Sequence, residues 1–175
     1  MKSTLPVSRS RVGVAALCGI LLVGNSLATA GDDKVAGLLK DLKSANPGTR
    51  AMAAMTLGKM GPSAKTAVSG LAEAVLDRNL NVRYFAAEAL KAVGPEAKAA
   101  VPALTKALET FPGGSPPLEG PQRYYADTRS VAAEALGAIG RGAREAVPAL
   151  RKALNDTDPS VRTAVAEALK RIEAK

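Results

Sequence analysis

Few side chains in this 175-residue sequence could carry out chemistry. The chain has no histidine, and its one cysteine, Cys18, lies in an apolar N-terminal stretch. Once that stretch is removed, no thiol nucleophile, imidazole base, or His or Cys metal ligand remains. Paired carboxylates are conceivable, for example Glu119 with Asp127, but nothing in the sequence fixes their separation. We therefore expect a protein that is not an enzyme and needs no cofactor or metal.

Three glutamates, Glu88, Glu134 and Glu167, occupy the same position of a repeated pattern. On a helical wheel, Tyr84, Glu88 and Lys91 share the side opposite the apolar residues of the same predicted helix. One interpretation is that this column receives a basic peptide or a cation. The other is a solvated face whose glutamates simply favour helix. The equivalent stripe over the whole chain comprises Ala51, Met55, Gly58, Tyr84, Glu88, Lys91, Ser130, Glu134, Gly137, Thr163, Glu167 and Lys170.

The segment 109–127, ETFPGGSPPLEGPQRYYAD, departs from the pattern and contains two of the chain's three tyrosines. A loop of this length within a compact unit is usually functional or disordered, and loops often carry functional residues. We interpret the segment as a partner contact, made by Phe111, Leu118, Arg123, Tyr124 and Tyr125. The alternative is that Tyr124 and Tyr125 lie against the core while the prolines stiffen a solvated loop.

Helical hairpins must position these residues. The clearest is 147–172, with two apolar-periodic helices around an N-D-T-D-P-S turn, in which Asp158 suits a helix N-cap and Pro159 the first helical position. The same unit recurs at spacings of 33, 33 and 46 residues, so the third unit carries a thirteen-residue insertion. Such a period predicts an all-α solenoid of four hairpins. The units begin at Val35, Val68, Val101 and Val147, and they span about 34–66, 67–99, 100–145 and 146–173.

Local signals mark the ends of the second helix in each unit. Asn46 and Asn79 occupy the same cap position as Asp158. Gly61, Gly94 and Gly140 follow the second helices, where we expect a left-handed backbone conformation.

The V-P-A-L start, the D-x-D-P-x-V-R turn and the A-x-E-A-L-x-x-I end resemble HEAT repeats, specifically the HEAT-like type of phycobilisome lyases. The likeness covers about residues 34–173. It implies a right-handed α-α superhelix, whose second helices commonly line the concave face. It also implies that a turn aspartate pairs with an arginine early in the second helix, here Asp77 with Arg83 and Asp156 with Arg162. Ser44 and Arg123 stand at the aspartate position in the other two units.

The resemblance leaves activity open, because this repeat hosts many functions. Some HEAT-like proteins are iron-dependent hydroxylases with His-Glu motifs, and others are DNA glycosylases with basic, tryptophan-containing faces. This chain has neither histidine nor tryptophan. We expect a binding or scaffold protein that docks a protein or peptide on its second-helix face. The alternatives are a lyase-like or chaperone-lyase factor for a chromoprotein and a weak polyanion binder.

The first 30 residues have the pattern of a signal peptide. Lys2, Arg9 and Arg11 precede an apolar run, 12–23, and Ala28-Thr29-Ala30 supplies a small-x-small cleavage pattern. The run is shorter than the roughly 20 residues that span a bilayer. We expect cleavage after Ala30, which leaves 31–175 as the HEAT-like domain, although an uncleaved anchor is the alternative.

Loss of the predicted signal leaves 21 basic and 16 acidic side chains, a net charge of +5 instead of +8. This moderate bias is not typical of nucleic-acid binding, so we expect no nucleic-acid partner. An export signal without other cysteines favours a bacterial periplasm or the cell exterior. We expect no stable membrane insertion once the signal is cleaved.

Overall fold

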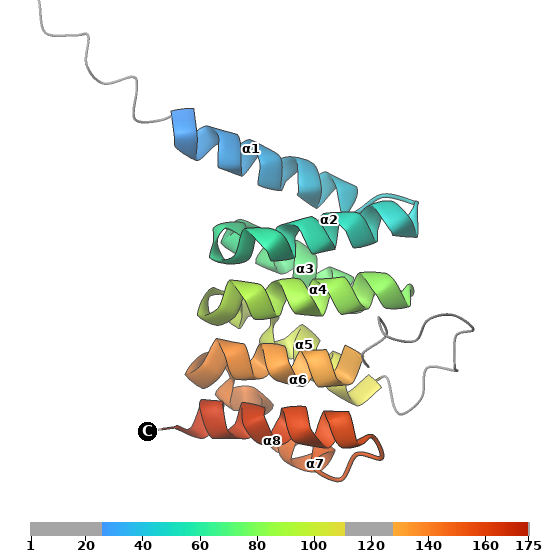
Figure 1. Cartoon of the computed structure of the whole chain (residues 1–175), viewed down its shortest axis with the longest axis vertical. Coiled ribbons are helices and arrows are strands. Elements are labelled where there is room, and N and C mark those ends of the chain that lie inside the picture. Colours follow the sequence, from blue (N-terminus) through green and yellow to red (C-terminus); the bar gives the residue numbers. More distant parts are fainter. Residues whose placement is uncertain (1–25, 111–127, 175) are drawn as a thin grey trace, which may run out of the picture.

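The computed structural model describes residues 26–110 and 128–174, which form helices joined by short turns, with no strand among them (Figure 1). The helices pair in chain order and each pair stacks on the next. The predicted all-α solenoid is therefore confirmed. The α-helices are α1 (Ser26–Asp41), α2 (Pro47–Met60), α3 (Val68–Ala74), α4 (Leu80–Val93), α5 (Val101–Thr110), α6 (Thr128–Ile139), α7 (Val147–Ala153) and α8 (Pro159–Glu173), and the 3₁₀ links are η1 (Gly61–Ala67), η2 (Gly94–Ala100) and η4 (Gly140–Ala146).

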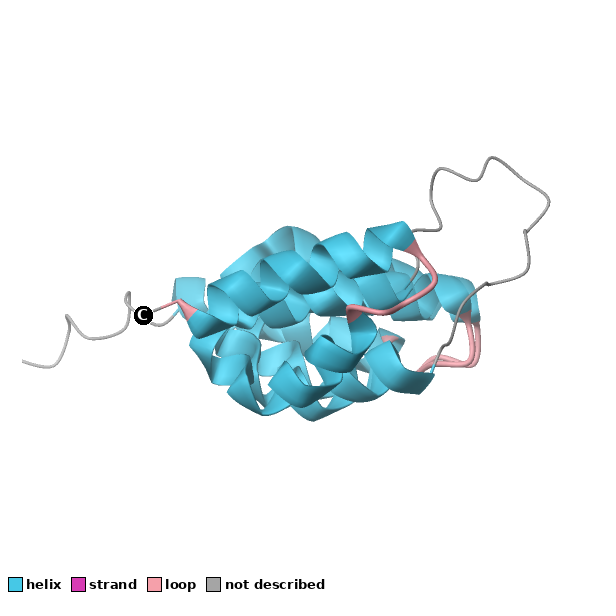
Figure 2. Ribbon diagram, turned by 90° about the horizontal axis from the view of Figure 1, so that it is seen from below, coloured by secondary structure: helices cyan, strands magenta, loops and turns pink. Residues whose placement is uncertain are grey.

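The stack has two layers (Figure 2). The second helices of the hairpins, α2, α4, α6 and α8, pack side by side in one layer. Helices α3, α5 and α7 lie behind them, and the turns between paired helices gather along one edge of the molecule. One continuous face of the stack is therefore built from second helices alone.

The ends of the second helices follow their sequence signals. The side chains of Asn46, Asn79 and Asp158 each accept a hydrogen bond from a backbone N–H of the first turn, which confirms the three predicted N-caps. The glycines after α2 and α4 have positive φ, as expected, but their ψ angles are −133° at Gly61 and −136° at Gly94. Their conformation is therefore not the left-handed helical one that we predicted. It lies near a region of φ and ψ that is open almost only to glycine.

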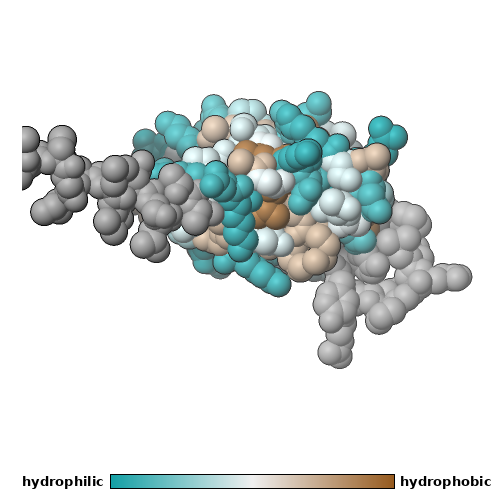
Figure 3. All heavy atoms as spheres, turned by 90° about the horizontal axis from the view of Figure 1, so that it is seen from above, coloured by the Kyte–Doolittle hydropathy of each residue, from teal (hydrophilic) through white to brown (hydrophobic). Residues whose placement is uncertain are grey.

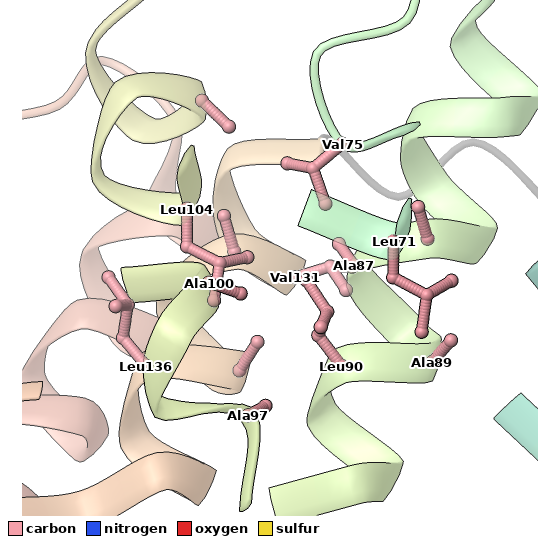
Figure 4. Packing of buried hydrophobic residues seen from close by; sticks show 14 of the residues in the cluster. Leu71, Val75, Ala87, Ala89, Leu90, Ala97, Ala100, Leu104, Val131 and Leu136 are labelled. Atoms are coloured by element: carbon pink, nitrogen blue, oxygen red, sulfur yellow. The ribbon is translucent and has the colours of Figure 1, made fainter. Parts of the chain in front are cut away.

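The core consists of leucine and valine rows filled in with alanine (Figure 4). Leu57, Leu90 and Leu136 come from equivalent positions of successive second helices, and each is fully buried. Because alanine buries little area, each contact contributes little at about 25 cal/mol per Å². Stability must therefore come from the repetition of close contacts between neighbouring hairpins.

Glycines allow two pairs of second helices to approach closely. A Cβ atom at Gly58 would lie 3.2 Å from the Cα of Ala89, and one at Gly137 would lie 2.9 Å from the Cα of Ala168. Gly58 and Gly137 occupy the same position in α2 and α6. The equivalent residue of α4 is Lys91, so α4 and α6 are joined differently.

We predict that Gly137→Ala lowers the free energy of unfolding by about 1–3 kcal/mol, because the added methyl meets backbone that cannot rotate away. Gly37→Ala is the matched control, since a Cβ at Gly37 in α1 would meet nothing within 4 Å. The control should be neutral or stabilising by up to about 1 kcal/mol, because alanine favours helix. Urea denaturation followed by circular dichroism measures both, and equal effects would contradict the close approach of α6 and α8.

Arginine–aspartate bridges link successive hairpins at the turn edge. Arg50 of α2 donates from Nε and Nη2 to the two carboxylate oxygens of Asp77, at 2.8 and 2.9 Å. Arg129 of α6 donates from Nη1 to Asp156, at 2.7 Å, and its side chain is only 3% exposed. In both cases an arginine in one second helix binds the aspartate in the turn of the next hairpin.

The pairing predicted within one hairpin is therefore wrong. Arg83 and Arg162 instead donate from Nη1 to backbone carbonyls of their own turns, including those of Asp77 and Asp156. These bonds hold each guanidinium against its own turn. Arg50 makes the same backbone bonds, to Ser44 and Ala45, while it binds Asp77.

Ser44 stands at the aspartate position of the first hairpin, where the described chain has no preceding arginine. Its hydroxyl accepts a hydrogen bond from the N–H of Asn46, as the carboxylate of Asp77 does from Asn79. Serine thus keeps the turn bond without the charge. Arg123, at the same position of the third unit, lies outside the described residues.

We predict that Arg129→Ala lowers the free energy of unfolding by about 2–4 kcal/mol, because it leaves the carboxylate of Asp156 without its buried partner. Arg162→Ala is the control, since Arg162 is exposed and has no carboxylate partner in the described chain. Its effect should stay below about 1 kcal/mol. Thermal melts of both variants measure the difference, and a costlier Arg162→Ala would restore the pairing within one hairpin.

The two ends of the stack differ. Met52 of α2 is 58% exposed beside Thr49 and Thr56, whereas Val131 of α6 and Ala164 of α8, at the position of Met52, are buried. Figure 3 looks onto this end and shows a small hydrophobic area surrounded by hydrophilic side chains. At the other end Leu154, directly after α7, is 39% exposed. Both residues are apolar because the repeat pattern is apolar there, and both are uncovered in this chain.

Candidate functional site

The second-helix face has an apolar hollow that includes several members of the predicted stripe. It holds about 280 Å³ between α2 and α4. Met55 and Gly58 of α2 lie on one side, and Tyr84 and Glu88 of α4 lie on the other. The remaining lining residues, which the sequence analysis missed, are Lys59, Phe85, Ala89 and Ala92.

The hollow exists because of Gly58. The glycine lets α2 approach Ala89 and places no side chain over the junction of the two helices. Between α4 and α6 the equivalent position carries Lys91, whose side chain occupies the junction. The junction of α4 and α6 is therefore occupied by a charged side chain, whereas the junction of α2 and α4 is lined by apolar ones.

Two aromatic rings form one wall of the hollow. Tyr84 and Phe85 are adjacent in α4, and their rings meet edge to face at 72° with centroids 5.3 Å apart. Both side chains are half-buried, so each presents part of its ring to solvent. Burial raises the pKa of the Tyr84 hydroxyl, and the negative charge of Glu88 raises it further. The phenol is therefore a neutral hydrogen-bonding group at the rim of an apolar surface.

Lysines neutralise the glutamate column. Lys91 Nζ lies 2.7 Å from Glu88 and 2.9 Å from Glu134, so one lysine bridges α4 and α6. Lys170 binds Glu167 at 3.1 Å. Burial lowers the pKa of Lys91, but its bonds to the two carboxylates outweigh that effect and raise it overall. The column therefore offers a basic peptide or a cation less free charge than the sequence indicates.

The predicted stripe is also interrupted. Ala51 is 8% exposed and Ser130 is 5% exposed, and Gly137 is buried as well. A wheel drawn for one helix omits neighbouring elements such as α8, whose Ala168 lies against Gly137. Of the stripe, Met55, Gly58, Tyr84 and Glu88 line the hollow, whereas Glu134 and Glu167 lie further along the face. The loop candidates Phe111, Leu118, Arg123, Tyr124 and Tyr125 fall outside the described residues.

Two further observations concern residues 26–110 and 128–174. In these ranges no group of three or more Asp, Glu, His or Cys side chains is placed to hold a metal ion. No helix of this described part is long and apolar enough to cross a membrane.

The stacked hairpins and their layer of second helices define an α-solenoid repeat protein. A family model of HEAT repeats matches residues 35–113 and 122–175. The chain therefore belongs to the HEAT-repeat family. A search of curated proteins gave no match.

Solved structures give the same fold. The complex of CpcE and CpcF of phycocyanin lyase from Nostoc sp. PCC7120 is similar with a TM-score of 0.65 and 23% identity, over 97% of this chain and 71% of that one. Two engineered proteins are similar with TM-scores of 0.58 and 0.59 and identities of 25% and 22%, over 79% and 80% of this chain. The chain spans 62% and 38% of the length of these engineered proteins.

The charges beside Tyr84 give a test of the site geometry. In a background with Tyr124→Phe and Tyr125→Phe, Lys91→Gln should raise the pKa of Tyr84, because a nearby positive charge is lost. Glu88→Gln should lower it, because a nearby negative charge is lost. Ultraviolet titration of the phenol measures both. Shifts of the same sign in the two variants would show that this arrangement of charges is wrong.

Proposed function

We propose that the chain is an exported, non-enzymatic binding protein that docks a protein or peptide partner on its second-helix face. The observation that carries the proposal is the apolar hollow between α2 and α4, which an α-solenoid presents on an open face. Its half-exposed aromatic pair is the kind of anchor that is common at protein interfaces.

The charges around the hollow specify the partner further. Lys59 and Glu88 lie at its border, and Glu88 and the two column glutamates beyond it, Glu134 and Glu167, are paired with lysines. A ligand that depends on dense charge has little to bind here. We therefore propose a partner segment with an apolar side chain, such as leucine or an aromatic residue, that enters between Met55 and Tyr84. Mixed charges on either side of that residue would suit Lys59 and Glu88.

The insertion 109–127 is proposed as a second contact that adds specificity. It interrupts the repeat at the turn edge of the third hairpin, between α5 and α6. Two of the chain's three tyrosines belong to it, which supports a role in binding. Its residues from 111 to 127 lie outside the described structure, so the proposal depends on their sequence.

A photo-crosslinking experiment tests the docking face. A photoreactive residue at Met55 should form a covalent adduct with a defined polypeptide from the exported fraction of the source cells. The same residue at Met52 is the matched control, because it lies three positions away on α2 but at the end of the stack. Tyr84→Ala in the Met55 variant should reduce the adduct by about tenfold, the effect of losing one aromatic anchor.

Two results would contradict the docking face. Equal adducts from Met52 and Met55 would place the partner elsewhere on α2. Adducts from Met55 that do not depend on Tyr84 would show that the hollow is not the contact. Separate measurements of the melting temperature confirm that the variants are folded, so that a lost adduct reports on binding.

The likeness to the phycocyanin lyase complex favours a second candidate, a lyase-like or chaperone-lyase factor for a chromoprotein. At 23% identity this likeness shows a shared fold alone. Visible absorbance that copurifies with the chain would favour this candidate. A colourless protein that still forms the Met55 adduct would favour the docking of an ordinary polypeptide.

A further inference from the structure

The C-terminal end of the stack repeats the surface that each hairpin presents to the next. At the end of the first helix, Leu42, Val75 and Leu108 are at most 7% exposed, since the following hairpin covers them. Leu154 holds the same position after α7 and is 39% exposed. One apolar residue of the hairpin interface, Leu154, is therefore uncovered at this end.

The polar half of the interface is present as well. Arg162 donates from Nη1 to the carbonyls of Asp156 and Thr157, at 2.8 and 3.0 Å. Arg50 makes the same two bonds within its own turn, and its Nε and Nη2 bind Asp77 of the next hairpin. Arg162 is exposed, and no carboxylate of the described chain reaches it. Its guanidinium is thus held in position with the edge that binds aspartate directed away from its own turn.

We propose that the C-terminal face of α7 and α8 binds a helical hairpin of a second, different protein whose turn carries an aspartate. That aspartate would bind Arg162 as Asp77 binds Arg50, and an apolar side chain of the partner would cover Leu154. The contact continues the interface that already joins the hairpins of this chain. It is separate from the hollow between α2 and α4 and does not depend on the proposed function.

The first hairpin of another copy of this chain lacks the required group. Ser44 stands where the partner's aspartate is needed, and a hydroxyl does not carry the negative charge that a guanidinium pairs with. Thr49 and Thr56 also add polar groups to that end of the stack. A second copy is therefore a poor occupant, which is why we assign the face to a different protein.

The same difference supplies a probe for the experiment. Ser44 and Asp77 both bond the N–H two residues ahead, so Ser44→Asp should place a carboxylate where Asp77 has one. A copy with Ser44→Asp and Arg162→Gln can offer the aspartate but cannot receive one. Mixed with the unaltered chain, it should form a one-to-one complex that sedimentation velocity detects. The control copy carries Ser44→Asn and Arg162→Gln.

We expect the aspartate copy to bind the unaltered chain at least about tenfold more tightly than the asparagine copy does. Arg162→Gln in the receiving chain should remove that difference. Tight binding should return when the receiving chain carries Arg162→Glu and the probe carries Ser44→Arg in place of Ser44→Asp. Leu154→Asp in the receiving chain should also weaken the complex. Melting temperatures of all variants separate lost binding from lost folding.

Three outcomes would overturn the proposal. Equal binding of the aspartate and asparagine copies would show that Arg162 does not receive a turn carboxylate. Binding that survives Arg162→Gln would place the contact elsewhere. Association of the unaltered chain with itself, with the same dependence on Leu154 and Arg162, would make this face an interface between identical copies.

Discussion

Each hairpin of this chain can bury its apolar side only against the hairpins beside it, since distant repeats of a solenoid do not touch. The contact between neighbouring second helices is therefore the constraint that the remaining structure must satisfy. Gly58 and Gly137 meet it by letting backbone approach backbone. Lys91 meets it between α4 and α6 by joining two carboxylates. The same position of the repeat thus serves either close packing or a charged bridge.

This choice has a consequence for function. A glycine at the junction of two helices leaves a hollow on the open face wherever larger side chains stand around it, as Met55 and Tyr84 do around Gly58. Gly137, at the junction of α6 and α8, is buried, whereas Gly58 is partly exposed. The candidate docking site therefore arises from the packing requirement together with the aromatic pair of α4.

The turn edge obeys a different rule. Arg50 binds the carbonyl of Ser44 in its own turn and the carboxylate of Asp77 in the turn of the next hairpin, so the bridge joins two hairpins. A buried arginine such as Arg129 depends on that carboxylate, because an unpaired charge in the interior is costly. Burial by itself raises the pKa of Asp77. The hydrogen bonds from the side chain of Arg50 and from the N–H of Asn79 outweigh burial and keep the pKa below the ordinary value. This bridge therefore stabilises the stack above the ordinary aspartate pKa and loses strength as the pH falls through the lowered one.

Periodicity and turn residues were enough to predict the helices, their caps and their order, because these depend on neighbours within about four positions. The ion pairs were not predictable in the same way. Asp77 lies six residues from Arg83 and 27 from Arg50, and spacing alone favours the nearer partner. The predicted stripe was wrong at Ala51 and Ser130, which are buried, because a wheel drawn for one helix does not include the elements packed around it. Phe85 was missed because the wheel placed it beside the face and not on it.

One residue of the sequence, Ser44, does indicate how the arginines and aspartates pair. Ser44 replaces the aspartate in the first unit, where the described chain offers no earlier arginine to bind it. If the pairs formed within a hairpin, that unit would need its aspartate as much as the others do, because Arg50 is present. The replacement fits a pairing between successive hairpins, because the described chain has no arginine that a carboxylate at position 44 would bind and no carboxylate that reaches Arg162. The two ends of the stack therefore differ chemically, with a serine at the first turn and, at the last, an arginine without a carboxylate partner in the described chain. This difference favours the binding of a hairpin from a different protein over the binding of another copy of the chain.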